Sequence, residues 1–239
     1  MKKKEDTSKK IKGKSRHTTA SINPDDAVKR GYLQEEYKLF YLNSIEKNYI
    51  PAHYHEFHKA IIFISGSLVY MVEGKHFLLN PGDILIIPAY AVHQPIIGEN
   101  IPYKRYVLWL KQSAADSLGA QELFSSAHIL GQEETTIDID PVISEAIEYI
   151  NNNLGEDLSV ETLTEKYYLS KSRFINRFKN ITGYTPHQYI TDKRIIKCAQ
   201  LMQAGANAGD AAARCGFKEY SVFYRAFKKA LGVSPRNYI

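Results

Sequence analysis

The hydrophobic residues of this chain follow two different spacings, one in each half. Between residues 37 and 110 they form short runs rich in β-branched and aromatic side chains, interrupted by Gly, Pro and Asn. From residue 142 onwards they recur every three or four residues, as on one face of a helix. The first pattern predicts an all-β domain and the second an all-α domain.

Turn residues divide the first half into short strands. Ser65-Gly66, Glu73-Gly74 and residues 80–83, which read Asn-Pro-Gly-Asp, mark three of these turns. Short strands at this tight spacing indicate a small antiparallel barrel or jelly roll.

Residues 216–235 predict the helix around which the second half is organised. Phe223, Phe227 and Leu231 lie four residues apart and form one apolar face. The opposite face is basic and polar, as a helix needs if it packs on one side and meets phosphates and base edges on the other. An ordinary amphipathic surface helix is the alternative. The residues predicted to contact DNA here are Lys218, Tyr220, Ser221, Tyr224, Arg225 and Lys228.

A second copy of this pattern lies upstream at a constant offset. Phe174 and Phe178 correspond to Phe223 and Phe227, and each copy ends in Gly-x-(Thr/Ser)-Pro. Two copies so close together are a specific signal for paired helix-turn-helix motifs. The first copy's predicted DNA contacts, with plain solvation as the alternative for each, are Lys171, Ser172, Arg173, Asn176 and Lys179.

Further residues of both copies follow a known family pattern. In the second copy they are Gly216, Phe217, Ser221, Phe223, Arg225, Phe227, Lys228, Lys229, Gly232, Ser234, Pro235 and Tyr238, and in the first they are Leu163, Ser170, Phe174, Phe178, Lys179, Thr182 and Gly183. At these positions the last hundred residues resemble the DNA-binding domain of AraC-type transcription regulators. Arg194 stands where that family has an arginine in its linker helix.

The resemblance implies a DNA-binding domain over residues 140–239, with helix-turn-helix motifs at about 159–181 and 208–231. Between them, Thr185-Pro186 predicts the start of a long helix that ends near Gln203. About 18 residues at ~1.5 Å rise give ~27 Å, so two recognition helices can meet groove segments ~34 Å apart.

The second motif departs from the family pattern at Ala208 and Ala211, where the family usually has large aliphatic residues. Replacing a buried Ile by Ala typically costs ~2–5 kcal/mol. Gly209 lowers the local helix propensity by a further ~1 kcal/mol. We therefore expect the second motif to be the softer one.

The first half carries a resemblance of its own. Residues 81–83, which read Pro-Gly-Asp, precede a hydrophobic strand, with His53-x-His55 before them and His93 after them. This pattern is similar to the cupin sensor domain that precedes the DNA-binding domain in many AraC-type proteins. It implies a cupin-like, effector-binding barrel within residues 23–111.

In metal-binding cupins, two His of the first motif, an acid and a His of the second motif meet inside the barrel. His53, His55 and His93 match, but Lys59 stands at the position of the acid. A cation there repels a divalent metal, although three imidazoles can hold zinc. We predict an effector site at His53, His55, Lys59 and His93 that binds a sugar or organic acid without a metal. In the alternative, the histidines only line the barrel mouth and Lys59 points outward to water. A cupin metalloenzyme tethered to a DNA-binding domain and a ligand-independent DNA-binding dimer are the alternatives.

The net charge of +5 is unevenly distributed. Residues 1–22 carry +6, residues 23–139 carry −5 and residues 140–239 carry +4. An acidic half followed by a basic half fits a sensor joined to a nucleic-acid-binding domain. Residues 1–22 are Lys- and Ser-rich and are predicted to be a disordered basic leader.

The segment 112–139 joins the two halves. Residues 112–123 are compatible with a helix, and in the family's usual arrangement helices at this place form the dimer contact. The rest of the segment is polar and is predicted to be a linker. The resemblance thus implies double-stranded DNA, a small-molecule effector and a second copy of the chain as partners, with activation as the commoner role. A contact with RNA polymerase stays open.

Other functions and locations find no support in the sequence. No apolar run approaches the ~20 residues of a membrane span, and the cysteines, Cys198 and Cys215, favour reduced thiols in a cytoplasm. No serine or cysteine nucleophile constellation and no Gly-rich phosphate loop is present, which sets hydrolases and kinases aside. We predict a cytoplasmic DNA-binding regulator with no cofactor and no catalytic residues. His58 and His76 lie outside the cupin pattern and are expected at the surface.

Overall fold

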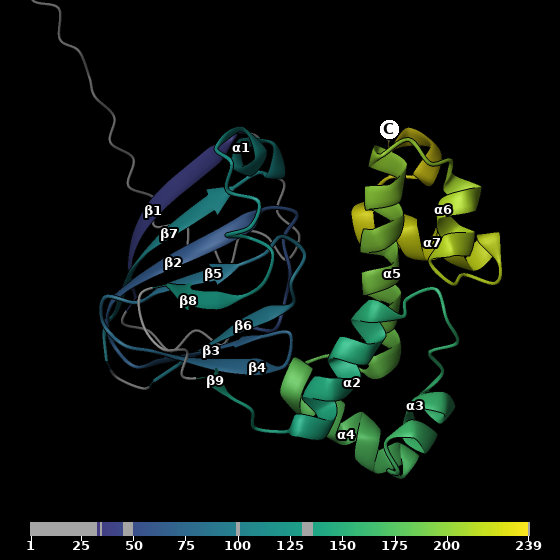
Figure 1. Ribbon diagram of the computed structural model, residues 1–239, viewed down its shortest axis with the longest axis horizontal. Helices are drawn as coiled ribbons and strands as arrows, with labels where there is room; N and C mark the ends of the chain where they lie inside the picture. The colour runs from purple at the N-terminus through teal and green to yellow at the C-terminus, as the bar shows by residue number, and fades with distance from the viewer. Residues whose placement is uncertain (1–32, 34, 45–49, 99–100, 131–135, 239) are drawn as a thin grey trace, which may run out of the picture.

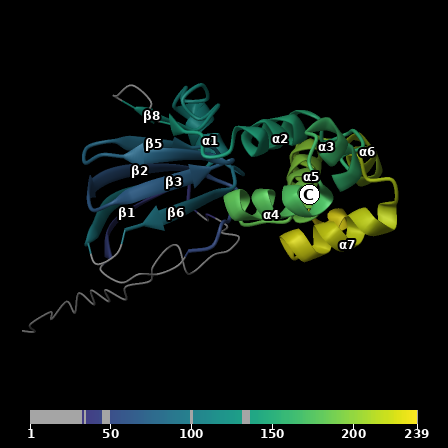
Figure 2. The ribbon, with the colours of Figure 1, turned by 90° about the horizontal axis from the view of Figure 1, so that it is seen from below.

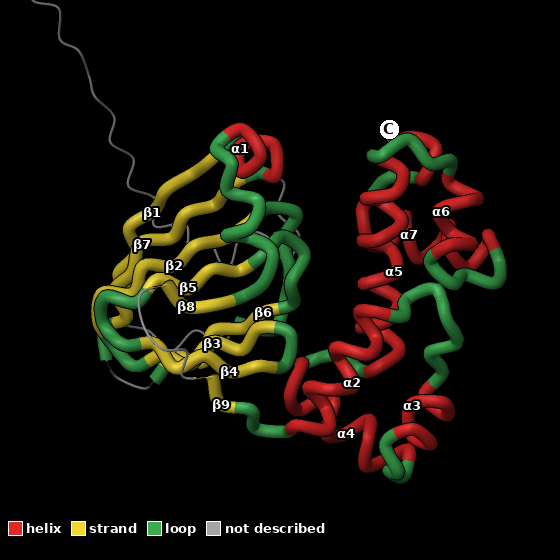
Figure 3. Tube along the Cα trace, in the orientation of Figure 1, coloured by secondary structure: helices red, strands yellow, loops and turns green. Residues whose placement is uncertain are grey.

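The computed structural model describes residues 33, 35–44, 50–98, 101–130 and 136–238. The predicted leader at residues 1–22 lies outside the described residues. The described chain forms a β domain followed by a helical domain, and the two lie side by side in both views (Figure 1, Figure 2). Strands and helices are segregated along the chain, apart from one short helix that caps the β domain (Figure 3).

Two antiparallel sheets face each other in the β domain, which we call the barrel. Its strands are β1 Tyr37–Ser44, β2 His58–Ser65, β3 Leu68–Val72, β4 Lys75–Leu79, β5 Ile84–Ile87, β6 His93–Ile97, β7 Tyr103–Leu110, β8 His128–Leu130 and β9 Thr136–Ile137. The first sheet has the order β1-β7-β2-β5-β8 and the second β6-β3-β4-β9. Both β8 and β9 come from the stretch predicted as a linker.

Alternate residues of each strand point between the sheets and form the core of the barrel. Ile61 and Phe63 on β2, Tyr70 on β3 and Phe77 on β4 are each at most 1% exposed. Lys59 belongs to the same inward row of β2 and is also buried. Its side chain therefore points into the barrel and not outward to water.

The turn between β3 and β4 consists of Glu73 and Gly74, as predicted, with φ of 48° and 83°. Two left-handed residues are what a type I′ hairpin turn requires. Glycine adopts this conformation freely, whereas a glutamate there is strained by about 1 kcal/mol or more. The side chain of Glu73 must therefore make contacts that hold it in place.

The helix α1 (Gln112–Ser117) folds back over the outer face of the first sheet. Ala115 is buried there with Ala60, Ile86 and Phe124. The helix is thus shorter than the stretch 112–123 predicted for it, and its buried face packs on its own barrel.

The helical domain consists of a first helix, two helix pairs and one longer helix that connects the two pairs (Figure 1). Its helices are α2 Pro141–Asn152, α3 Val160–Lys166, α4 Lys171–Thr182, α5 Pro186–Gln203, α6 Ala208–Arg214, α7 Tyr220–Leu231 and the 3₁₀ turn η1 Pro235–Asn237. The pairs are α3–α4 and α6–α7. No helix in the described part of the chain combines the length and apolarity needed to cross a membrane.

Phenylalanine pairs form the centres of the two halves of this domain. Phe174 and Phe178 of α4, like Phe223 and Phe227 of α7, are fully buried. The ring centroids within each pair lie 5.8 Å and 5.3 Å apart, respectively. Two separate cores therefore flank α5, and α4 and α7 each present the opposite face outward.

Candidate functional site

The residues predicted to contact DNA are all exposed, and they lie opposite the buried phenylalanine pairs of α4 and α7. On α4 the exposed residues are Lys171, Ser172, Arg173, Asn176 and Lys179. Just before and on α7 they are Lys218, Tyr220, Ser221, Tyr224, Arg225 and Lys228. The two exposed faces are thus formed as the sequence pattern predicts, although exposure by itself does not assign a role.

Two of these lysines make ion pairs within the domain. Lys171 pairs with Glu161, and Lys218 Nζ lies 3.9 Å from Asp157 Oδ2. All four side chains are more than half exposed, and exposed pairs of this kind contribute little to stability. Both ammonium groups therefore remain available for other anions.

Arg177 of α4, which sequence reasoning missed, has a structural contact instead. Its Nε donates to Asp140 Oδ2 at 2.8 Å and its Nη2 to Asp140 Oδ1 at 2.5 Å. Oδ1 also accepts from Ile143 N at 3.2 Å, which caps α2. Burial by itself raises the pKa of Asp140, but the hydrogen bonds and charge of Arg177 outweigh it and lower the pKa. This pair ties α4 to the start of α2.

His53, His55 and His93 meet inside the barrel as a buried histidine cluster. One nitrogen of each ring lies within 4.8 Å of the others. Nδ1 of His53 lies 2.7 Å from Pro51 O, and Nδ1 of His93 lies 2.8 Å from Ala91 O. Because a carbonyl oxygen only accepts, both Nδ1 atoms must carry the proton. The Nε2 atoms of His53 and His93 therefore hold lone pairs in the neutral rings.

Lys59 lies beside the cluster, with its Nζ 3.4 Å from the hydroxyl of Tyr70. Burial lowers the pKa of His93 well below its ordinary value, and the charges of His53, Lys59 and His55 lower it further. His93 is consequently neutral at physiological pH. The cluster thus combines imidazole acceptors with one ammonium donor.

By number and type, the three imidazoles form a donor set that fits zinc. Lys59 is buried close enough for its charge to act on His93, so it opposes the binding of a divalent ion among the three rings. A metal here would be held by His53, His55 and His93.

His58 and His76 are buried, which corrects the expectation that they lie at the surface. Nε2 of His58 donates to Gln112 Oε1 at 2.9 Å, and its Nδ1 accepts from Ala89 N at 3.0 Å. Burial lowers the pKa of both imidazoles. His58 therefore joins α1 to the barrel, a long-range contact that its sequence position does not reveal.

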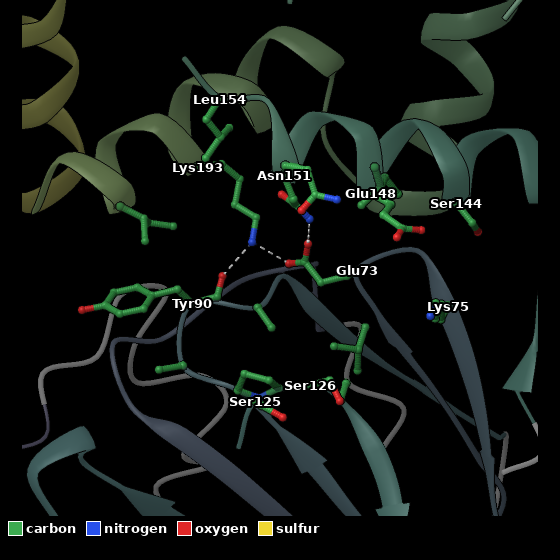
Figure 4. Close-up of a pocket in the computed structure, with 18 of the residues that line it drawn as sticks. Glu73, Lys75, Tyr90, Ser125, Ser126, Ser144, Glu148, Asn151, Leu154 and Lys193 are labelled. Carbon is green, nitrogen blue, oxygen red and sulfur yellow. Dashed lines mark hydrogen bonds and ion pairs between the residues drawn. The ribbon is translucent and has the colours of Figure 1, made fainter. Parts of the chain in front are cut away.

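The helical domain contacts the turn between β3 and β4 through Glu73 (Figure 4). The carboxylate accepts from Lys193 Nζ at 2.8 Å, from Asn151 Nδ2 at 2.7 Å and from the hydroxyl of Tyr189. Lys193 also donates to Tyr90 O at 3.2 Å. The sequence marks Glu73 only as a turn residue, so this junction was not predicted.

The charge on Glu73 is maintained by these partners. Burial by itself raises the pKa of Glu73, but the charge and hydrogen bond of Lys193 and the bonds from Tyr189 and Val92 N lower it more strongly. A cavity of about 690 Å³ opens beside the pair, between the barrel and α2 and α5 (Figure 4). None of the three clustered histidines lines this cavity.

Comparisons with known proteins agree with both halves of this arrangement. Residues 163–239 match a helix-turn-helix domain family, and residues 45–104 match a cupin domain family. The chain is 31% identical over 137 residues to the probable transcriptional regulator LumQ of Photobacterium leiognathi. These matches make the chain similar to AraC-type transcription regulators. The match with LumQ covers 54% of this regulator and about half, 54%, of LumQ.

Two further proteins show the extent of the likeness. The regulator is 26% identical over 211 residues to the uncharacterized HTH-type transcriptional regulator YobQ of Bacillus subtilis, covering 78% of this chain and 88% of YobQ. It is also similar to the solved C-terminal domain of AraT, a response regulator from Geobacillus stearothermophilus. That match has 29% identity and a TM-score of 0.41, and it covers 43% of this chain and 86% of that one.

Proposed function

We propose that this regulator binds DNA sequence-specifically through two helix-turn-helix motifs, α3–α4 and α6–α7, joined by α5. The observation that carries the proposal is the likeness of α4 and α7. Each has 12 residues, a buried phenylalanine pair and a polar, mostly basic exposed face. The 18 residues of α5 span ~27 Å, which suits two recognition helices in successive major-groove segments of one duplex.

The exposed side chains divide into two roles in this proposal. Lys171, Lys179 and Lys228 reach phosphates, which gives affinity that falls with salt. Arg225 pairs with a guanine edge and Asn176 with an adenine edge, because their donors and acceptors match those bases in the major groove. The remaining groove-facing residues are Ser172, Arg173, Lys218, Tyr220, Ser221 and Tyr224.

Selection from a random duplex pool, followed by footprinting, tests this function. We expect the full chain to enrich a sequence whose footprint covers two segments about 10 base pairs apart. Retention of all duplexes alike, with no protected sequence, would refute sequence-specific binding.

The barrel is proposed to bind a small effector at the histidine cluster. In the neutral form, Nε2 of His53 and of His93 accepts hydrogen bonds from hydroxyl groups, while Lys59 donates to a hydroxyl or carboxylate oxygen. A sugar or an organic acid carrying hydroxyls offers both kinds of group. A thermal-shift screen detects such a ligand, since about 100 Kd of free ligand stabilises the folded state by ~2.7 kcal/mol. The shift should disappear in Lys59→Met.

A cupin metalloenzyme is the second candidate, and the three-histidine donor set is the observation that favours it. Elemental analysis of the purified chain decides between them, with near-stoichiometric zinc or iron supporting the enzyme. If no metal and no stabilising ligand is found while DNA is still selected, the barrel serves only to dimerise.

The remaining partners belong to the same proposal. A homodimer forms through the segment 112–123 after β7, where α1 is followed by the exposed Leu118. The regulator acts in the cytoplasm, with RNA polymerase as a further contact. Sedimentation analysis measures the dimer, and Leu118→Ser should weaken it.

A further inference from the structure

One end of the histidine cluster adjoins a contact between the barrel and the helical domain. Ala52 directly precedes His53, and its carbonyl accepts from the hydroxyl of Tyr184 at 3.0 Å. A Cβ at Gly183 would lie only 2.9 Å from the Cβ of Ala52, so the end of α4 is packed closely on this residue. Movement of His53 therefore reaches α4 through a single intervening residue.

The other end of the cluster adjoins the junction at Glu73. Val92 directly precedes His93, and its amide donates to Glu73 Oε1 at 2.5 Å, while Glu73 N donates to Val92 O at 2.8 Å. The same carboxylate oxygen accepts from Lys193 of α5, which also binds the carbonyl of Tyr90. The loop before His93 is thus bonded to α5 both directly and through Glu73.

The imidazoles of His53 and His93 each hold the backbone segment that precedes them. The Nδ1 atoms of His53 and His93 donate to Pro51 O and Ala91 O, two residues back in each case. The two segments are also bonded to each other, His53 N to His93 O at 3.0 Å and His93 N to His53 O at 2.8 Å. A ligand that binds at Nε2 and displaces either ring changes the geometry of the bond from Nδ1 to Pro51 O or Ala91 O. Because a hydrogen bond depends steeply on its geometry, the bonded segment either follows the ring or loses the bond.

The turn residue Glu73 has a strained backbone, and its side chain is bonded to the helical domain. Its backbone is left-handed, with φ of 48°, which a glutamate adopts only when its surroundings impose it. Its side chain and that of Lys193 are 21% and 14% exposed, so solvent screens the pair only weakly. The pair is therefore sensitive to small shifts of Val92 and Tyr90.

We propose that Glu73 transmits the state of the histidine cluster to the helical domain. A ligand that moves His53 or His93 shifts the segments 51–52 and 91–92, and this changes how firmly the barrel holds α5 and the end of α4. This inference rests on the proposed sensing role of the barrel. It names the path by which occupancy of that site reaches the DNA-binding helices.

Hydrogen exchange of the full chain, without DNA or effector, tests the junction first. In Glu73→Gln the amides of the first turns of α5 and of residues 90–92 should exchange about tenfold faster, because exchange follows local opening. Lys193→Met removes the other partner of the pair and should speed exchange of the same amides. The double variant should exchange little faster than either single variant, because both remove the same interaction. Glu148→Gln, on the wall of the same cavity, is the matched control and should change nothing. Unchanged exchange of α5 in both junction variants overturns the proposal.

Two substitutions of His93 then test transmission. The amide nitrogen of an asparagine lies near the place of Nδ1 and can still donate to Ala91 O, whereas a glutamine reaches towards Nε2 and loses that bond. His93→Gln should therefore speed exchange in α5, and His93→Asn should do so much less. In the Glu73→Gln background His93→Gln should have no further effect on α5. Equal effects of the two substitutions, or an effect that persists without Glu73, overturn the transmission path.

The hydrogen-exchange results test the path through Glu73 independently of the proposed function. If no duplex is selected and no ligand stabilises the barrel, the sensing role fails while the exchange results still report the junction. If DNA and ligand both bind but His93→Gln leaves α5 unchanged, the sensor stands and the path through Glu73 is wrong.

Discussion

Gly183 and Gly232 provide a matched test of how tightly the barrel packs on the helical domain. They end α4 and α7 in the same left-handed conformation, with φ of 75° and 78°. A Cβ at Gly232 would meet nothing within 4 Å, whereas one at Gly183 would lie 2.9 Å from the Cβ of Ala52. The alanine substitutions therefore share one penalty and differ in the other.

The shared penalty is backbone strain, about 1–2 kcal/mol for an L-residue in the left-handed region. Gly183→Ala also forces two methyl carbons apart by roughly half an ångström or more, since carbon atoms prefer ~3.5–4.0 Å. Overpacking of this kind costs ~1–3 kcal/mol. The free energy of unfolding should thus fall by about 1–2 kcal/mol in Gly232→Ala and by about 2–5 kcal/mol in Gly183→Ala.

Urea unfolding followed by circular dichroism measures both losses. The decisive comparison uses Ala52→Gly as a background, because it removes the opposing methyl group. There, Gly183→Ala should cost no more than Gly232→Ala costs in the wild type. If Gly183→Ala costs the same with and without the Ala52 methyl, the close packing of the barrel on α4 does not exist in solution.

Three further outcomes follow from the helical domain. Arg225→Ala should lose ~1–3 kcal/mol of DNA-binding free energy and relax the preference at one base, whereas Lys228→Ala should weaken binding to all duplexes alike and reduce the salt slope by about 1. Fluorescence anisotropy with selected and scrambled duplexes distinguishes the two variants. Identical, sequence-independent losses in both would contradict base reading by Arg225. Asp140→Ala removes both the cap of α2 and the contact with Arg177 and should cost ~2–3 kcal/mol, while Asp140→Asn keeps a capping oxygen and should cost about half as much. Because the folded-state pKa of Asp140 is lowered, its contribution to the free energy of unfolding is present at neutral pH and is lost as the pH falls through that pKa. Identical acid-induced losses of stability in the wild type and in Asp140→Asn would contradict this contribution. The α6–α7 pair should exchange its amides faster than α3–α4, and equal protection of the two pairs would show that the small residues of α6 are compensated.

The sequence predicted more of the helical half than of the barrel. In the helical half, Ser159 caps α3 by accepting from Thr162 N, and the stretch from Pro186 to Gln203 forms α5, as their local signals indicated. The buried phenylalanines of α4 were also predictable from their spacing. These features depend on residues within one or two helical turns, so a linear pattern contains the necessary information.

In the barrel, the sequence indicated the turns and brought the right histidines into one group. It did not indicate that β8 and β9 complete the sheets, or that His58 is buried against α1. Strand order and burial depend on pairings between distant segments, and the alternation along one strand does not name its neighbour.

The residues by themselves determined a β half, a helical half, two similar exposed faces and a histidine set with a lysine in place of an acid. Tertiary structure alone decided that Lys59 points into the barrel and that Glu73 meets Lys193. Those two residues are 120 positions apart, and each is an ordinary charged residue in its own neighbourhood. Their pairing exists only because α2 and α5 pack on the turn between β3 and β4 and remove both side chains from most of the solvent. A buried charge without its partner is costly, so the two charged groups pair.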